Sequence, residues 1–326
     1  MRRTLFATLL AVVVAAATAP AAWAGNAGAN HQVVSAAKKA APKSSKKAAK
    51  KASKKPKAAN RWESLPLPPV LPAPVASGDV ASAGAQIHYM TFGPTAAASD
   101  AARVVVLLHG GMGNSDQMTH QVAALQDRYR VITIDSRGQG RSAPTDDGIH
   151  YAQMADDVIA VLDELKIERA TFVGWSDGGV IGLQLGIRHP ARVTSLWLLA
   201  TNYNLAGMQS TASSATFGKY WQSCAARAVE YGVAIDDSAK VRAALRKMWR
   251  SEPEIDEAEL RKIEAPTIVA LGDHDELIKR QHAKRLATLL PHATFVLLQD
   301  VSHFALWQDP DAVNASILGL LSQPVK

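Results

Sequence analysis

The sequence predicts an α/β protein in which a mostly parallel sheet carries helices on both faces and is interrupted by a helical insertion. Two observations predict this fold class. From about Val75 onward, short and nearly continuous apolar runs alternate with segments of helical periodicity, as in parallel strands that are buried on both faces. Between Asn202 and Ile263 the strand-like runs stop and helical periodicity remains. We therefore expect the sheet order to be interrupted there by helices.

The expected elements alternate along the chain. The strands are short runs rich in Val, Ile and Leu, at Arg103–Leu108, Arg130–Ile134, Ala170–Val173, Val193–Ala200, Thr267–Leu271 and Thr294–Leu298. The helices between them have apolar residues at helical spacing, at Gln117–Asp127, Tyr151–Leu165, Gly178–Arg188 and Ala312–Leu321. The insertion contains three more helical segments, at Tyr220–Tyr231, Ser238–Arg250 and Glu257–Lys262.

The first 24 residues have the features of a secretory signal peptide. A positively charged start, Met1-Arg2-Arg3, precedes an apolar run from Leu5 to Ala17, and Ala22-Trp23-Ala24 matches an Ala-x-Ala cleavage site. An uncleaved membrane anchor is the alternative, but the run is shorter than the roughly 18–20 apolar residues that a spanning helix needs. We therefore expect residues 1–24 to be removed and the protein to be periplasmic or secreted.

Residues 25–75 are rich in Lys, Ala and Pro and are expected to form a disordered linker. The chain has 36 Lys and Arg against 29 Asp and Glu, but 13 of the basic residues and none of the acidic ones lie in residues 1–61. The remainder therefore has 23 basic and 29 acidic residues, which argues against a nucleic-acid-binding domain. The basic tail is either a solvated linker or an arm attracted to an anionic envelope surface. Residues 76–326 are expected to form the functional domain.

A serine stands at the predicted turn between a strand and a helix, in the segment GWSDG at 174–178. A tight turn there strains the backbone of the central residue and lifts its side chain above the sheet. The N-terminus of the following helix favours developing negative charge. Glycine at both ends of the segment allows the close approach of neighbouring chain. Ser176 is therefore the candidate nucleophile, and a purely structural turn is the alternative.

The glycine-rich segment HGGMG at 109–113 follows directly on the strand that ends at Leu108. Acyl transfer produces an oxyanion, which needs preorganised backbone N–H donors, and a glycine-rich turn presents such donors without interfering side chains. We expect one donor from Gly111, with Met112 as the neighbouring candidate, and the other from the backbone of Asp177. The histidine of this segment is expected to be structural.

An acid and an imidazole follow two later strands. Asp273 and Asp275 come at the end of one strand, and His303 follows the next. A serine hydroxyl needs an imidazole as base, and the imidazole needs a carboxylate that fixes its tautomer and stabilises its cation. Because ligands in open α/β sheets bind at the carboxyl ends of the strands, we expect His303 and one of the two aspartates to meet Ser176 there.

Together these motifs resemble the α/β-hydrolase superfamily over roughly residues 82–321. The resemblance is carried by HGG at 109–111, DSRGQGRS at 135–142, GWSDGG at 174–179, GDHD at 272–275 and His303. It implies a triad of Ser176, Asp275 and His303, since the acid of this family usually closes a Gly-x-x-Asp pattern. It also implies that residues 135–142 form a structural turn. One departure is that Ser302 precedes the histidine, where the family often has glycine.

The resemblance further implies a helical lid at about 202–263 that shapes the substrate pocket. GWSDGG is similar to the serine turn of small-ester hydrolases of the valacyclovir hydrolase and biphenyl-hydrolase-like kind. The implied activity is hydrolysis of small carboxylic esters or lactones through an acyl-enzyme, and it requires no metal or organic cofactor. Two alternatives stay open: carbon–carbon bond hydrolysis or cofactor-free perhydrolysis on the same triad, and a non-catalytic envelope-binding protein.

Several single residues have two interpretations. The Asp177 carboxylate is a candidate for attracting a substrate amine, besides the backbone role given above. Cys224, the single cysteine, is expected to be buried by packing rather than reactive. Trp175, Trp221 and Trp249 are expected to pack in the core or lid rather than to line a pocket. The sequence leaves the substrate and the oligomeric state open.

Overall fold

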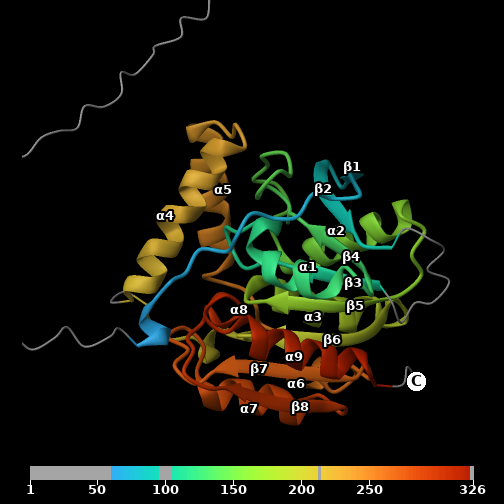
Figure 1. The fold of residues 1–326 in the computed structure, drawn as a ribbon, viewed down its shortest axis with the longest axis vertical. Helices are drawn as coiled ribbons and strands as arrows, with labels where there is room; N and C mark the ends of the chain where they lie inside the picture. Colours follow the sequence, from blue (N-terminus) through green and yellow to red (C-terminus); the bar gives the residue numbers. More distant parts are fainter. Residues whose placement is uncertain (1–59, 95–103, 212–213, 324–326) are drawn as a thin grey trace, which may run out of the picture. The chain divides into compact units, whose positions relative to one another are not determined.

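The computed structural model describes residues 60–94, 104–211 and 214–323, so the predicted signal peptide and most of the predicted linker lie outside the described residues. The α/β fold class is confirmed, because the described residues form one eight-stranded sheet flanked by helices (Figure 1). The strands are β1 (Ala76–Ser82), β2 (Ala85–Phe92), β3 (Val104–Leu108), β4 (Arg130–Ile134), β5 (Ala170–Trp175), β6 (Val193–Leu199), β7 (Thr267–Gly272) and β8 (Ala293–Leu298).

The sheet has the strand order β1-β2-β4-β3-β5-β6-β7-β8. The hairpin of β1 and β2 is antiparallel and joins β4 antiparallel, whereas all the other neighbours are parallel. Every residue of β3, β5, β6 and β7 is buried. These strands form the centre of the core because their nearly continuous apolar runs require cover on both faces. Their parallel direction brings the loops after β3, β5, β7 and β8 to one edge of the sheet.

The helices are α1 (Thr119–Leu125), α2 (Tyr151–Glu164), α3 (Asp177–Arg188), α4 (Ala215–Glu230), α5 (Ile235–Met248), α6 (Glu257–Leu260), α7 (Arg280–Leu289), α8 (Ala305–Gln308) and α9 (Pro310–Leu321). Short 3-10 turns are η1 (Arg61–Glu63), η3 (Ser115–Met118), η4 (Pro190–Arg192) and η5 (Leu205–Gly207). Helix α1 contacts α9, and α2 contacts α3. Figure 1 shows α1 and α9 in front of the strands. Across the described ranges, no helix combines the length and the hydropathy that a membrane crossing requires.

The helical insertion lies between β6 and β7, and Figure 1 shows α4 and α5 projecting together beyond the sheet. Helix α4 begins at Ala215, because Ser214 caps it by accepting a hydrogen bond from the N–H of Phe217 at 3.2 Å. The buried residues Phe217, Tyr220 and Cys224 recur at helical spacing, so one face of α4 packs inward. Both helices begin several residues before the expected positions.

Two parts of the fold differ from expectation. The β1–β2 hairpin was not predicted, because β1 is largely exposed and the turn is Ala83-Gly84, with φ of +41° and +80°, rather than the usual Asn-Gly. The linker expected over residues 25–75 also differs in its last part. Residues 60–75 belong to the same compact unit as the sheet, so this unit includes chain before the expected boundary at residue 76.

Candidate active site

Ser176 occupies the turn between β5 and α3 in a strained backbone conformation. Its φ of +55° and ψ of −116° lie in a region that side-chain-bearing residues rarely adopt. The strain is held by close packing: a Cβ atom on Gly174 would lie 2.3 Å from the carbonyl oxygen of Gly178. A Cβ on Gly178 would lie 2.2 Å from the carbonyl oxygen of Leu108. Glycine is therefore required at both ends of the turn.

His303 and Asp275 lie on the loops after β8 and β7 and form a buried pair. The Nδ1 atom of His303 is 3.1 Å and 3.2 Å from the two carboxylate oxygens of Asp275, and the side chains are 2% and 1% exposed. Asp275 Oδ1 also accepts hydrogen bonds from the N–H groups of Leu277 and Ile278, at 2.9 and 2.7 Å. These bonds hold the carboxylate of Asp275 in place against the imidazole, which fixes the proton of His303 on Nδ1 and leaves Nε2 as the basic nitrogen.

Of the two candidate aspartates, the structure brings Asp275 to His303. Asp273 instead accepts a hydrogen bond from the N–H of Val301 at 3.3 Å. The Gly-x-x-Asp spacing and the geometry therefore select the same residue.

The electrostatic surroundings of His303 favour its protonated form. Burial disfavours the imidazolium, but the carboxylates of Asp275, Glu276 and Asp177 outweigh this effect and raise the pKa of His303 above its ordinary value of 6.5. Glu276 also accepts a hydrogen bond from the backbone N–H of His303, at 3.0 Å. Glu276 follows Asp275 directly in the motif, yet sequence reasoning gave it no role.

Gly111 and Asp177, the candidate oxyanion donors, line one cavity with Ser176 and His303. Neither backbone N–H has a hydrogen-bond partner among the residues that the structure describes, so both are available to an oxyanion. Met112, the neighbouring candidate, does not line this cavity but a second one behind the turn. The geometry therefore favours Gly111 over Met112.

The cavity around Ser176 has a volume of about 210 Å³ and lies between the sheet edge and the helical insertion. Aromatic side chains dominate its wall: Tyr151, Trp175, Phe217, Tyr220, Trp221 and Trp249. The three tryptophans thus line the cavity, which corrects the expectation that they only pack in the core or lid. The lining has the carboxylates of Asp177 and Glu252 but, among the described residues, no Lys or Arg.

Asp177 presents its carboxylate to this cavity. Its two oxygens accept hydrogen bonds from the Tyr151 hydroxyl at 2.8 Å and from Trp249 Nε1 at 2.9 Å. Burial raises the pKa of Asp177 to about 6, although the Trp249 and Tyr151 hydrogen bonds and the nearby His303 oppose the shift. Sequence reasoning missed Tyr151 and Glu252, because nothing in helical periodicity marks a residue that faces a distant loop.

His109 is structural, as expected. Its Nδ1–H donates to the carbonyl oxygen of Gly110 at 2.7 Å, and its Nε2 accepts a hydrogen bond from the N–H of Ser136 at 2.9 Å. Burial lowers its pKa, so it stays neutral in this role. The histidine therefore ties the glycine-rich turn to the segment 135–142, which packs beside the site without facing the cavity of Ser176.

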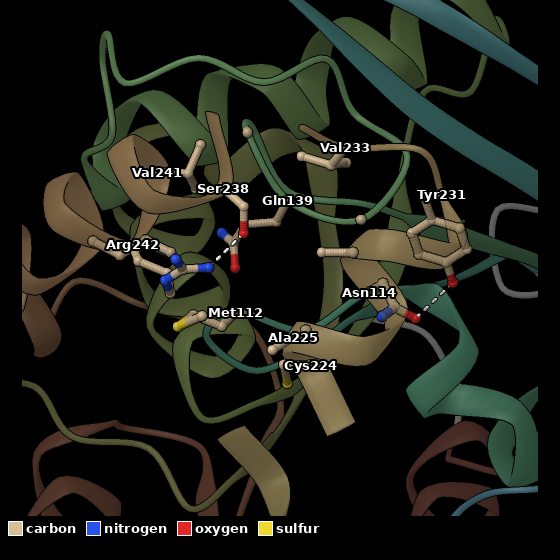
Figure 2. A pocket seen from close by; sticks show the side chains of 15 residues that line it. Met112, Asn114, Gln139, Cys224, Ala225, Tyr231, Val233, Ser238, Val241 and Arg242 are labelled. Atoms are coloured by element: carbon tan, nitrogen blue, oxygen red, sulfur yellow. Dashed lines mark hydrogen bonds between the residues drawn. The ribbon is translucent and has the colours of Figure 1, made fainter. Parts of the chain in front are cut away.

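A second, smaller cavity of about 40 Å³ lies between the insertion and the turns at 112–114 and 138–140. Figure 2 shows two hydrogen bonds between residues that line this cavity. Within α5, Arg242 donates to the hydroxyl of Ser238 at 2.6 Å. The Tyr231 hydroxyl donates to the side-chain oxygen of Asn114 at 3.3 Å. Cys224 also lines this cavity. Burial raises the pKa of its thiol to about 11, which makes it a poor nucleophile and agrees with a packing role.

One group of described residues could offer three metal ligands, since Asp273, His274 and Asp300 bring possible ligand atoms within 4.8 Å of one another. Two of them are exposed. The imidazole of His274 is stacked on Trp62, with ring centroids 3.8 Å apart. The stacking accounts for the placement of His274 without a metal.

Comparison with known proteins agrees with this geometry. A family model described as alpha/beta hydrolase fold matches residues 103–232. A candidate carbamate hydrolase, RutD, from Caulobacter sp. (strain K31) is 31% identical over an alignment of 262 positions, and the match covers 72% of this chain and 95% of that protein. The 3-oxoadipate enol-lactonase 2 of Acinetobacter baylyi is 27% identical over 73% of this chain and 93% of its own length.

Solved structures show the same similarity. Est816, an N-acyl homoserine lactone degrading enzyme, has a TM-score of 0.59 and 29% identity, and the match covers 74% of this chain and 99% of that one. The enol-lactonase of Burkholderia xenovorans LB400 has a TM-score of 0.62 and 24% identity, with 76% and 100% covered; at this identity the likeness concerns the fold. By its relatives and its architecture, the chain is a hydrolase that belongs to the α/β-hydrolase family.

Proposed function

We propose that the protein is an exported serine hydrolase that cleaves small carboxylic esters or lactones through an acyl-enzyme on Ser176. One observation carries the proposal: the hydrogen-bonded pair Asp275–His303 and the strained Ser176 belong to loops at one sheet edge, and His303 and Ser176 line one cavity. The names of two similar proteins, an enol-lactonase and an N-acyl homoserine lactone degrading enzyme, support the substrate class.

The mechanism begins with proton transfer from the Ser176 hydroxyl to Nε2 of His303 while Oγ attacks the acyl carbon. The developing oxyanion accepts hydrogen bonds from the N–H groups of Gly111 and Asp177. His303 then donates the proton to the departing alkoxide oxygen, which leaves an ester on Ser176. Water, deprotonated by the same imidazole, attacks this ester; the bond between the acyl carbon and Oγ breaks, the acid leaves, and His303 returns the proton to Oγ of Ser176. Asp275 stabilises the imidazolium in both half-reactions.

The cavity restricts the substrate by size and charge. A volume of about 210 Å³ suits a small substrate, and its aromatic wall favours apolar groups. The carboxylates of Asp177 and Glu252 meet no Lys or Arg in the described lining, so a substrate with a free carboxylate encounters like charge. Neutral or cationic esters and lactones are therefore the preferred class.

Turnover of p-nitrophenyl esters and simple lactones tests the proposal. Ser176→Ala should reduce kcat by about 10⁴-fold or more, whereas Ser251→Ala, a change at an exposed position three residues after the end of α5, should leave it unchanged. Covalent labelling by a fluorophosphonate should occur on the wild type and not on Ser176→Ala. Equal inactivity of wild type and Ser176→Ala on all esters and lactones would refute the ester-hydrolase proposal. Turnover of vinylogous diketones in that case would favour carbon–carbon bond hydrolysis.

Export is a separate part of the proposal and rests on the sequence of residues 1–24. The mature chain is expected to begin at Gly25, which N-terminal sequencing of the protein recovered outside the cytoplasm would show. An intact N-terminus in a membrane fraction would indicate the anchor instead. For the basic tail we propose electrostatic contact with an anionic envelope surface, and such contact should weaken as salt is raised.

A further inference from the structure

Residues 60–65, which we call the strap, precede the first strand and contact both loops that carry the acid–base pair. The strap contains η1 (Arg61–Glu63), and Leu65 packs against the hydrophobic core. These residues lie before the region that the α/β-hydrolase family model matches. Ordering such a segment costs conformational entropy, so its contacts must offset that cost.

The first contact reaches the loop of Asp275. The ring of Trp62 stacks on the imidazole of His274, with centroids 3.8 Å apart and planes within 6° of parallel. His274 directly precedes Asp275, and its backbone N–H donates to the carbonyl oxygen of Val301 at 3.0 Å. Trp62 therefore holds a residue that links the loop after β7 to the loop after β8.

The second contact reaches the loop of His303 through Gln308. The Nε2 of this buried side chain donates to the carbonyl oxygen of Ser64 at 2.7 Å. Its Oε1 accepts a hydrogen bond from the N–H of Ser302, also at 2.7 Å. Ser302 directly precedes His303. The side-chain amide of Gln308 thus joins the strap to the residue beside the candidate base, since its nitrogen donates to the strap and its oxygen accepts from Ser302.

A third contact closes the arrangement. Arg61 donates from Nε and Nη2 to the carbonyl oxygens of Asp300 and Gln299, at 3.2 and 3.1 Å. Its Nη1 also contacts the carboxylate of Asp309 at 2.7 Å. The guanidinium therefore spans the beginning of the His303 loop and the start of α9.

From these contacts we propose that the strap is a positioning element of the active site, with Trp62 and Gln308 as positioning residues that hold Asp275 and His303 in register. Neither residue touches the cavity of Ser176, so both act through the loops. Catalytic geometry is sensitive to small displacements, and a misplacement of about 1 Å can cost about 100-fold in rate. The inference rests on the proposed function only for its kinetic test.

The kinetic test compares variants of the mature chain on a p-nitrophenyl ester. Trp62→Ala and Gln308→Leu should each lower kcat about 10-fold or more, with KM changed less than about two-fold because the cavity wall is untouched. The acid limb of the pH profile should move to lower pH, since a looser Asp275 carboxylate supports the imidazolium less. Trp62→Phe keeps a stacking ring and should restore most of kcat. Val70→Ala, at a side chain that is 93% exposed, is the matched control.

A second readout does not need turnover. The proton on Nδ1 of His303 should give a low-field NMR signal in the wild type that broadens by exchange in Trp62→Ala and sharpens again in Trp62→Phe. If wild type proves inactive on esters but this signal responds, the proposed function fails and the strap inference stands. If Trp62→Ala and Gln308→Leu lower only the melting temperature, with kcat, pH profile and signal unchanged, the strap is merely structural and the inference is wrong.

Discussion

His303 sets the pH range of the proposed reaction, because only the neutral imidazole accepts the proton of Ser176. The neighbouring carboxylates, led by Asp275, hold its pKa above 6.5, so the inactive cation persists to higher pH than in an ordinary histidine. We expect kcat/KM to fall as the pH drops through this raised pKa. Asp275→Asn should move the acid limb to lower pH and reduce kcat by up to about 10⁴-fold. The measurement is a pH–rate profile from pH 5 to 9.

Asp273→Asn provides the control for this pH prediction. Asp273 lies two residues from Asp275 and bonds the N–H of Val301 rather than His303. Its loss should leave the acid limb in place. An unchanged limb in Asp275→Asn would mean that another group controls the pH dependence.

Asp177 makes a second prediction, about substrate charge. Its pKa of about 6 leaves the carboxylate ionised above that pH, in a cavity without a Lys or Arg among the described lining residues. Esters with a free ammonium group should react better than their N-acetylated counterparts, by about 10-fold if one charged hydrogen bond is gained. The preference should disappear below pH 6 and in Asp177→Asn, which retains the backbone N–H. Equal kcat/KM for both ester types at pH 8 would exclude this role.

At the residue scale, the candidate catalytic residues could be predicted from the sequence, whereas the residues that surround them in the cavity could not. Ser176, Asp275 and His303 could be selected because each follows a predicted strand, and parallel strands end at one edge. Tyr151 and Glu252 could not be selected. The Tyr151 hydroxyl donates to Asp177, and the Tyr151 N–H donates to Glu252. These contacts arise where the start of α2 meets the chain after α5, and periodicity does not encode them.

The helical insertion is linked to the candidate base through Glu276. One carboxylate oxygen accepts a hydrogen bond from the N–H of His303 at 3.0 Å, and the other accepts from the Thr216 hydroxyl at 2.5 Å and from Ser214 at 3.2 Å. The carboxylate of Glu276 therefore connects the first turn of α4 to the loop that carries His303. A displacement of α4 would remove partners of Glu276 and alter the charge that surrounds His303.

Thr216→Val tests this link. The substitution removes a hydrogen bond to a charged group, worth about 1.5–3 kcal/mol, so amide hydrogen exchange in the first turn of α4 should accelerate by about 10-fold. The kcat of Thr216→Val should fall, whereas the kcat of Ser223→Ala, the control, should stay at the wild-type value, because the Ser223 hydroxyl donates to the carbonyl oxygen of Tyr220 within α4. Identical exchange in Thr216→Val and wild type would show that Glu276 does not hold the insertion.

At the element scale, the strands with continuous apolar runs were easy to predict and the β1–β2 hairpin was not. β3 and β7 are continuous apolar runs. β1 has the sequence ASGDVAS, in which small and polar residues of the kind found in loops predominate. Helix α4 was expected to begin at Tyr220, but its capping residue Ser214 lies earlier. Caps depend on one hydrogen bond rather than on periodicity, so the helix boundary was less predictable than the helix.

At the scale of the whole molecule, composition separates a basic N-terminal stretch from a more acidic remainder, but it does not reveal which residues before residue 76 contact the sheet domain. The prolines between 66 and 74 suggested a spacer up to residue 75. The structure instead joins residues 60–65 to the loops after β7 and β8 through Trp62 and Arg61. Such contacts connect residues more than 200 positions apart, and no local pattern in the sequence signals them.

A buried ion pair links distant parts of the molecule and yields a prediction about stability. Arg137 and Asp157, whose side chains are 1% and 3% exposed, pair at 2.6 Å. Arg137 also donates to the carbonyl oxygens of Ser82 and Asp147, at 3.2 Å each. The pair thus connects the turn after β4, the β1–β2 hairpin and α2. Removing one partner leaves a buried charge without compensation, which costs about 3–5 kcal/mol.

Arg137→Met should therefore lower the free energy of unfolding by about 3–5 kcal/mol in urea titrations followed by circular dichroism. The double variant Arg137→Met/Asp157→Leu should recover much of this loss, because it removes the unpaired carboxylate as well as the guanidinium. Lys240→Met, at an exposed pair with Asp237, should leave the free energy nearly unchanged, since exposed pairs contribute little. A double variant no more stable than Arg137→Met would instead assign the loss to the Arg137 bonds with Ser82 and Asp147, and the hairpin rather than the charge pair would then be the element that Arg137 secures.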